Sequence, residues 1–321
     1  ADAVGQRAHV PRVTMLLVMG FAAGPGGFDL LPSEAEDWFP VVTELALVMI
    51  GFLLGAEFTA ATMRSRGSRL VAIALTQATV TVLLVAACLL AVGADSALAL
   101  PLAAIAAATA PAATVAVIHE VKARGPLSRT VLAVVAIDDI AALALFAMAV
   151  AAAAAVSGAD GAAGAAGDAA WEVVGGVLVG GAVGLPAASL TGRLQAGEPT
   201  REEAFGIVLV CAGLALWLDV SFILAAVVMG TVVANLARHH EYPFREIENI
   251  EWPFLTIFFF LAGARLELDQ LSMIGVLGTA YVIARTVGKV AGAAVGCRLT
   301  GDRSATGPLL GVSLLPQAGV A

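Results

Sequence analysis

Charge is scarce in this chain, and its scarcity limits the kinds of protein the chain can be. Only 13% of its 321 residues are Asp, Glu, Lys or Arg, whereas 60% are hydrophobic. An average soluble domain carries about 25% charged residues, so a water-soluble fold is excluded. The net charge is −8, and the only lysines are Lys122 and Lys289. Without a basic stripe, the sequence predicts no nucleic-acid partner.

Cysteine is rare as well, and this removes another set of functions. The three cysteines, Cys88, Cys211 and Cys297, all lie inside apolar stretches. They show neither the spacing of a metal site nor a disulfide framework. We expect them to be small buried hydrophobic residues.

Long apolar stretches occupy most of the sequence, and the mean hydropathy is +0.94. A helix needs about 20 apolar residues to cross a bilayer. The first stretch contains Pro11 and Pro25 and the last reaches Ala321 without a closing loop, so we expect the chain to begin inside one helix and end inside another. We predict an all-α polytopic membrane protein with eleven membrane segments, at residues 10–28, 39–60, 70–93, 97–119, 130–156, 171–192, 204–219, 221–237, 252–268, 271–298 and 304–321.

Lysine and arginine are distributed unevenly between the two ends of these segments. If the chain crosses the membrane at each segment, successive loops lie on opposite sides. Of the 17 lysine and arginine residues, 14 then lie in loops and chain ends on one side, and Arg265 alone lies on the other side. The remaining two, Arg285 and Lys289, lie within a segment. Because cytoplasmic loops carry an excess of positive charge, we place the basic loops and the N-terminus in the cytoplasm.

Four charged residues lie deep in apolar segments, where each costs about 2.5–3.5 kcal/mol. Asp138 and Asp139 are adjacent in one segment, and Lys289 lies in another. Asp138 lies nine residues beyond Arg129, and Lys289 lies nine residues before Arg298. At about 1.5 Å per residue, both side chains lie about 13 Å from the basic side, so a contact between them is geometrically possible.

These charges allow a functional and a purely structural interpretation. Neighbouring helical residues point about 100° apart, so Asp139 can face a cavity while Asp138 faces the lysine. Arg285 lies one turn from Lys289, and we expect it to reach the same carboxylates. A carboxylate placed between apolar surroundings and an ammonium can exchange a proton for a monovalent cation. The alternative is a buried ion pair that only orients helices.

Proline interrupts two further segments. Pro111 lies between Thr109 and Thr114 in the segment before the Asp pair, and Pro316 lies in the segment after Lys289. Interrupted segments in corresponding positions of two halves are typical of a transporter's midplane site. We expect freed carbonyls and half-helix ends at these breaks to help coordinate a cation.

Several motifs together resemble the monovalent cation/proton antiporters, in particular the bacterial sodium/proton exchangers with an adjacent Asp pair. The matching stretches run through nearly the whole chain: AIDDI (136–140) is similar to the ion-site motif, TAPAAT (109–114) and HEVKARGPLSR (119–129) to the first crossing helix and its turn, FFFLAGARLEL (258–268) to a Phe-rich helix, GKVAGAAVG (288–296) to the lysine helix, and DRSATGPLLGVSLLPQAG (302–319) to the start of the second crossing helix.

The resemblance implies an NhaA-like antiporter fold, with inverted repeats and two crossing broken helices. It implies that Asp139 is the main carboxylate for the cation and the proton, and that Asp138 is the partner of Lys289. Thr109 would belong to the unwound stretch that faces the ion. The expected accessory residues are Arg285, Pro111, Thr114, Pro316 and Gln317.

By the same resemblance, the protein is a secondary transporter and not an enzyme. It would exchange Na⁺ or Li⁺ for protons by alternating access, without a cofactor, as a homodimer in the lipid of a bacterial plasma membrane. The expected parts are N-terminal dimer or scaffold helices (1–69), a first core repeat (70–156), a flexible linker rich in Gly and Ala (157–170), further scaffold helices (171–251) and an incomplete second core repeat (252–321).

Two departures from the family pattern keep other interpretations open. Gln317 and Ala318 follow Pro316, where similar exchangers carry a basic and an acidic residue, and Arg285 is an additional buried base. The alternatives are a K⁺/H⁺ exchanger or K⁺ efflux system of the Kef type on the same fold, a sodium-coupled solute symporter of related fold, and an intramembrane aspartyl protease. A protease would need two acids that face each other from separate helices, and adjacent acids diverge.

Overall fold

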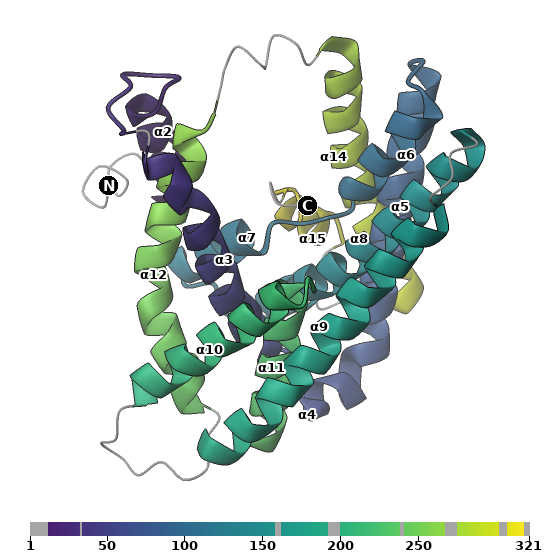
Figure 1. Cartoon of the computed structure of the whole chain (residues 1–321). Coiled ribbons are helices and arrows are strands. Elements are labelled where there is room, and N and C mark those ends of the chain that lie inside the picture. Colours follow the sequence, from purple (N-terminus) through teal and green to yellow (C-terminus); the bar gives the residue numbers. More distant parts are fainter. Residues whose placement is uncertain are drawn as a thin grey trace.

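The computed structural model describes residues 12–32, 34–157, 162–191, 200–237, 241–266, 275–301 and 307–317. Helices account for nearly all of these residues (Figure 1). In chain order they are α2 (Arg12–Ala23), α3 (Glu34–Gly55), α4 (Ala60–Thr62), the π-helix η1 (Met63–Gly67), α5 (Ser68–Ala91), α6 (Ser96–Ile105), α7 (Pro111–Glu120), α8 (Pro126–Ser157), α9 (Ala162–Thr191), α10 (Thr200–Trp217), α11 (Phe222–Leu236), α12 (Glu241–Ala264), α14 (Gly275–Thr300) and α15 (Gly307–Ser313).

These helices coincide with the apolar segments expected from the sequence. Each predicted segment overlaps one helix, and the proline-interrupted segment 97–119 overlaps two, α6 and α7. Among the described residues, four stretches are long and apolar enough to cross a membrane by length and composition, namely Trp38–Gly55, Ala60–Ala91, Ala170–Leu190 and Glu241–Ala264. The predicted all-α membrane architecture is therefore confirmed.

Helix α12 begins at Glu241, well before the expected segment 252–268. Its first half is amphipathic, with Ile247 and Glu251 both fully buried. A search for long apolar stretches does not find this half of α12, because only one narrow side of the helix is buried and the other residues are polar.

The structure contradicts the predicted linker at 157–170 wherever it describes these residues. Helix α9 begins at Ala162, so residues 162–170 belong to a helix and not to a flexible connection. Their sequence, AAGAAGDAA, is dominated by alanine, which has the highest helix propensity. The helix propensity of the six alanines outweighs the low propensity of the two glycines. Residues 158–161 lie outside the described part of the chain.

The helices pack in two groups. Helices α2, α3, α10, α11 and α12 contact one another, as do α5, α6, α8, α14 and α15, while α9 packs against α11, α8 and α10. In Figure 1, α2, α3 and α12 lie on one side of the molecule and α5, α6 and α14 on the other. The expected boundary between residues 251 and 252 falls inside α12, which packs against α2, α3 and α10. By its contacts, α12 therefore belongs with the first of these two groups of helices.

Three glycines spaced four residues apart let α14 approach α5 closely. A Cβ atom at Gly292 would lie only 2.8 Å from the Cα atom of Gln77. Equivalent atoms at Gly288 and Gly296 would lie 2.9 Å and 3.1 Å from the Cα atoms of Thr81 and Ile73. Small residues at this spacing are typical of tightly packed membrane helices. This contact fixes the position of α14, which carries Lys289, relative to α5.

Replacement of Gly292 by valine should destabilise the protein, because the added side chain overlaps the backbone of α5. Overpacking of this kind costs about 1–3 kcal/mol. Thermal unfolding of the purified protein in detergent measures the loss. Gly213→Val is the matched control, because nothing lies within 4 Å of a Cβ atom at Gly213. Equal melting temperatures for the two variants would contradict the proposed close packing.

Candidate functional site

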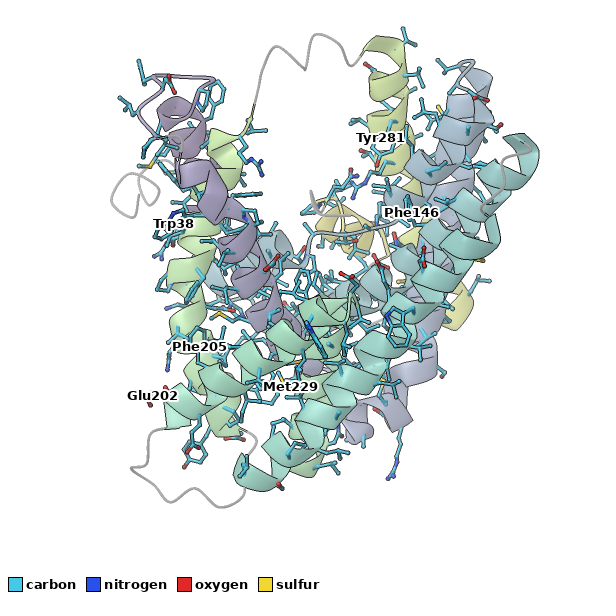
Figure 2. The ribbon with its side chains drawn as sticks, in the orientation of Figure 1. Trp38, Phe146, Glu202, Phe205, Met229 and Tyr281 are labelled. Atoms are coloured by element: carbon cyan, nitrogen blue, oxygen red, sulfur yellow. The ribbon has the colours of Figure 1, made fainter. Side chains whose placement is uncertain are left out.

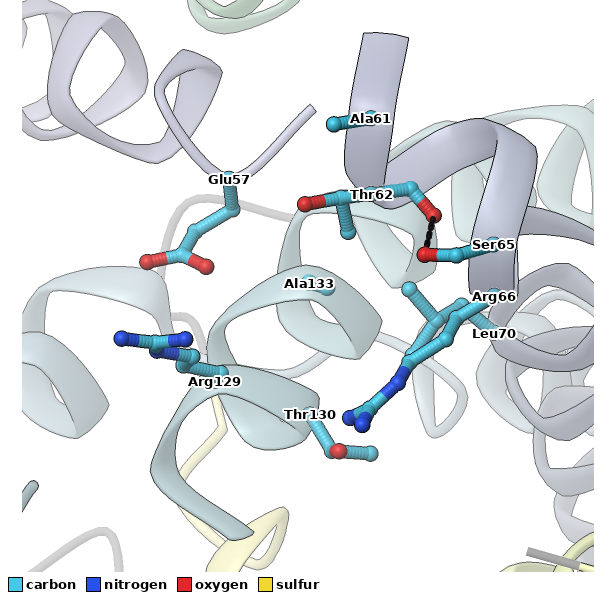
Figure 3. Close-up of a pocket in the computed structure, with 9 residues that line it drawn as sticks. All are labelled: Glu57, Ala61, Thr62, Ser65, Arg66, Leu70, Arg129, Thr130 and Ala133. Carbon is cyan, nitrogen blue, oxygen red and sulfur yellow. Dashed lines mark hydrogen bonds between the residues drawn. The ribbon is translucent and has the colours of Figure 1, made fainter. Parts of the chain in front are cut away.

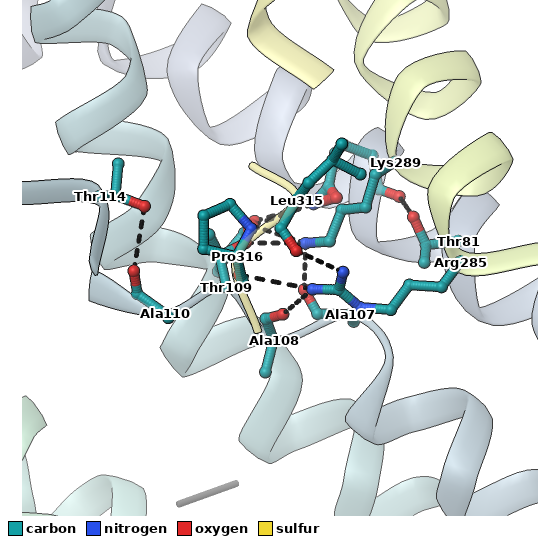
Figure 4. Close-up of polar contacts among 12 residues, drawn as sticks. Thr81, Ala107, Ala108, Thr109, Ala110, Thr114, Arg285, Lys289, Leu315 and Pro316 are labelled. Carbon is teal, nitrogen blue, oxygen red and sulfur yellow. Dashed lines mark hydrogen bonds and ion pairs between the residues drawn. The ribbon is translucent and has the colours of Figure 1, made fainter. Parts of the chain in front are cut away.

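The two helix breaks meet near the middle of the molecule. The first is an unwound stretch, residues 106–110, between α6 and α7, and the second follows α15 at residues 314–317. The backbone N–H of Ala110 donates a hydrogen bond of 2.9 Å to the carbonyl oxygen of Pro316. Figure 4 shows Pro316 beside Thr109 and Ala110. The unwound stretch and the residues that follow α15 therefore meet at this point, which we call the crossing.

Pro111 is the first residue of α7, where its missing N–H is not needed and its fixed φ favours the helix. It therefore starts the second half-helix, and the unwound residues precede it. Thr114 lies one turn further on, and its hydroxyl donates to the carbonyl of Ala110 at 3.0 Å. Thr114 therefore supports the start of α7 and makes no described contact with the charged residues.

Arg285 binds the carbonyl ends of both breaks. Its Nη1 atom donates to the carbonyl of Leu315 at 2.6 Å, and its Nη2 atom donates to the carbonyl of Ala108 at 3.0 Å. Its side chain is nearly fully buried in α14. Helix C-termini carry unpaired carbonyls and a partial negative charge, which a guanidinium neutralises. The described hydrogen bonds of Arg285 all go to backbone carbonyls, so its expected contact with the carboxylates stays a prediction.

Lys289 lies one turn further along α14 and is fully buried. Its ammonium donates to the carbonyl of Ala107, to the hydroxyl of Thr109 at 2.8 Å and to the carboxylate of Asp138 at 3.2 Å. The first acceptor belongs to the unwound stretch between α6 and α7. Lys289 thus joins that stretch to helix α8.

Asp138 is the acceptor at the centre of this cluster, and it too is fully buried. Its Oδ2 atom accepts a hydrogen bond of 2.7 Å from Thr109, in addition to the one from Lys289. The amide of Gln77 donates to both carboxylate oxygens, at 3.0 and 3.1 Å. Three separate elements, α5, the unwound stretch and α14, therefore hold one carboxylate.

Gln77 is a partner of Asp138 that no sequence motif indicates. It is a single amide in the apolar stretch 70–93 and is fully buried. A polar side chain in the middle of a membrane segment is rare enough to be the signal that could have identified it.

Two other predicted residues are placed differently. Asp139 lies in α8, but its side chain is outside the part of the chain that the structure describes, so its predicted role as an ion ligand is not tested. Gln317 is exposed, and its amide donates to the hydroxyl of Tyr281 at 2.7 Å. It lies at the edge of the crossing and has no described contact with Asp138.

The four charged residues that the sequence places deep in membrane segments balance in formal charge. Asp138 and Asp139 contribute two negative charges, and Arg285 and Lys289 contribute two positive charges. Removing one member of such a buried set leaves an uncompensated charge, which costs about 3–5 kcal/mol.

Arg285→Met should destabilise the crossing, because it leaves the carbonyls of Ala108 and Leu315 without their donor. Each buried carbonyl that loses its hydrogen bond costs about 1–3 kcal/mol. The free energy of unfolding, measured by denaturant titration in mixed micelles, should fall accordingly. Arg298→Met is the control, since Arg298 is exposed in the last turn of the same helix. A loss no greater than that of the control would show that Arg285 does not hold the breaks.

Comparison with known proteins agrees with this arrangement. The model of the transmembrane sodium/hydrogen exchanger family matches residues 2–321. No curated protein sequence matches the chain. Among solved structures, the chain is similar to the sodium proton antiporter MjNhaP1 from Methanocaldococcus jannaschii at pH 8, with 17% identity, a TM-score of 0.67 and coverage of 97% of this chain and 81% of that one.

A second structure of MjNhaP1, from electron microscopy, gives a TM-score of 0.74 at 15% identity and covers 96% of this chain and 77% of that one. These matches establish the antiporter fold. The family and its structural neighbours are transporters and not enzymes, so the protease alternative is wrong. Because the family model covers nearly the entire sequence, the chain belongs to the sodium/hydrogen exchanger family.

Proposed function

We propose that the protein exchanges Na⁺ or Li⁺ for protons across a bacterial plasma membrane by alternating access. The cation and the proton compete for Asp139, next to Asp138 in α8. The observation that carries the proposal is the cluster of Asp138, Thr109 and Lys289 at the crossing of the two unwound stretches. A site of this kind, at interrupted helices between two repeats, is typical of ion-coupled transporters.

Competition between the cation and the proton follows from the chemistry of the carboxylate that binds either of them. A proton and a monovalent cation each neutralise one negative charge, and a desolvated carboxylate gains from either. Because the charges at the crossing already balance formally, binding both together would leave an excess positive charge away from water, which is costly. Arrival of Na⁺ therefore favours release of H⁺, and the reverse step reloads the site.

Asp138 has a different role from Asp139 in this mechanism. Its two oxygens already accept hydrogen bonds from Gln77, Thr109 and Lys289. It holds the lysine against the unwound stretch and so keeps the crossing in place. Asp139 lies about 100° further round the same helix and is the carboxylate that we assign to the transported ion.

Alternating access also requires that the two groups of helices move relative to each other. The group containing α5, α6, α8, α14 and α15 would move against the scaffold helices, with the basic loops in the cytoplasm. Two copies of the chain would form a homodimer through the scaffold helices. No resident cofactor takes part, because the transported ions supply the charge.

Asp139→Asn should abolish exchange, because an amide can neither release a proton nor neutralise a cation. The full-length protein is reconstituted in liposomes with an imposed pH gradient, and Na⁺, Li⁺ and K⁺ are added in turn. Wild-type protein should collapse the gradient with Na⁺ or Li⁺, and the variant should match protein-free liposomes. Glu202→Gln, an exposed acid-to-amide change in α10, should leave exchange intact.

Full exchange by the Asp139→Asn variant would refute the site assignment. A response of the wild type to K⁺ alone would instead identify a K⁺/H⁺ exchanger.

Lys289→Gln should alter the pH dependence of exchange or the charge moved per cycle, because it removes the cation that contacts Asp138. Both are measured in the same liposomes, with a pH-sensitive dye and with a membrane-potential dye. Lys122→Gln is the matched control, since it removes the other lysine of the chain at an exposed position. If both variants behave like the wild type, Lys289 has a structural role only.

A further inference from the structure

A second site lies apart from the crossing, at the end of the molecule where α3 ends and α5 and α8 begin. It is a cavity of about 280 Å³ (Figure 3). This is close to the lower end, about 300 Å³, of the volumes that small-molecule sites occupy. Its lining comes from the turn after α3, from α4 and η1, and from the first turns of α5 and α8: Glu57, Ala61, Thr62, Ser65, Arg66, Leu70, Arg129, Thr130 and Ala133.

Two guanidinium groups reach this cavity from different elements. Arg66 comes from η1 and Arg129 from α8, and both are exposed. Figure 3 shows the side chain of Arg66 directed toward Thr130 and the guanidinium of Arg129 opposite the carboxylate of Glu57. In the described part of the chain, neither guanidinium forms an ion pair or donates a hydrogen bond to another side chain. Each therefore has its fork of N–H donors available for a ligand.

Two of the three hydroxyl groups that line the cavity donate to backbone carbonyls. Ser65 donates to the carbonyl of Thr62 at 3.2 Å, and Thr130 donates to the carbonyl of Pro126 at 2.9 Å. The third hydroxyl, that of Thr62, accepts a hydrogen bond of 2.9 Å from Thr59. The positively charged donors for a ligand are therefore the two arginines. The formal charge of Arg66, Arg129 and Glu57 together is +1, which disfavours a cation and matches an anion with one negative charge.

The local backbone is also unusual. Arg66 lies in a π-helix of five residues, Met63–Gly67. Such turns are rare and occur frequently at functional sites. The cavity lies among the basic loops that the positive-inside rule places at the cytoplasmic surface, where anionic lipid headgroups are abundant.

We propose that this cavity binds a phosphate-bearing anion, held by the guanidinium groups of Arg66 and Arg129. Arginine recognises phosphate through paired N–H donors. Two arginines on separate elements can therefore bind one phosphate from two sides. The ligand would be the headgroup of an anionic phospholipid or free phosphate, since the recognised chemistry is the same. It would tie η1 to the first turn of α8.

Glu57 is compatible with an anion in this cavity. Burial raises the pKa of its carboxyl group, and the neighbouring guanidinium of Arg129 lowers it to a smaller extent. The upward shift lowers the cost of placing a phosphate beside this carboxyl group.

Thermal unfolding of the full-length protein tests the proposal directly and independently of transport. The delipidated protein is measured in neutral detergent with inorganic phosphate or with chloride at equal ionic strength. It is also measured in nanodiscs of phosphatidylcholine alone or mixed with phosphatidylglycerol. We expect phosphate, phosphatidylglycerol or both to raise the melting temperature. The double variant Arg66→Gln/Arg129→Gln should weaken this binding more than about tenfold.

The matched control is Arg64→Gln/Arg69→Gln, which removes the same charge from exposed arginines of the same region that do not line the cavity. Stabilisation by phosphatidylglycerol alone would identify a lipid headgroup, and stabilisation by phosphate alone would identify a free anion. An equal loss in both double variants would indicate unspecific attraction and overturn the proposal. No stabilisation of the wild type by either probe would overturn it as well.

Discussion

Every unwound residue in the interior of a membrane protein needs hydrogen-bond partners from the protein itself, because lipid offers none. This requirement dominates the centre of the molecule, where two segments lose their helical hydrogen bonds at the same place. The breaks satisfy each other in part, through the bond from Ala110 to Pro316. The carbonyls of Ala107, Ala108 and Leu315 accept hydrogen bonds from Lys289 and Arg285, one turn apart on α14. The two buried bases therefore have a structural function at the crossing.

The same arrangement explains why a carboxylate can lie at this depth. Asp138 receives donors from α5, from the unwound stretch and from α14, so that its charge is compensated by groups that are fixed by packing. The glycines of α14 bring Gln77 of α5 within reach, because a larger residue at Gly292 would separate the two helices. Asp138 therefore lies within a rigid set of charges. In the proposed mechanism, exchange of a proton for a cation is then the main change that the site can undergo.

The sequence predicts much of this arrangement because membrane segments obey simple rules of length and charge. The apolar stretches indicated the helices, the prolines marked both breaks, and equal depth allowed the contact between Asp138 and Lys289 that the structure contains. The partners of Arg285 could not be predicted, because they are backbone carbonyls and carry no sequence signal. The contact of Gln77 with Asp138 depends on how α5 packs against its neighbours. The helix over residues 162–170 forms because the helix propensity of alanine prevails over that of glycine. Asp139 as the ion ligand remains a prediction from resemblance.

The crossing joins distant parts of the chain, and this has a consequence for how the protein is made. The carbonyls of Ala107 and Ala108 receive their donors from residues 182 and 177 positions further along. During synthesis, the first interrupted segment must enter the membrane long before α14 leaves the ribosome. Until then its open backbone has to be sheltered by water in the insertion channel or by a temporary helical form. Insertion of the early segments and closure of the centre are therefore separate events, and the second must wait for the C-terminal third of the chain.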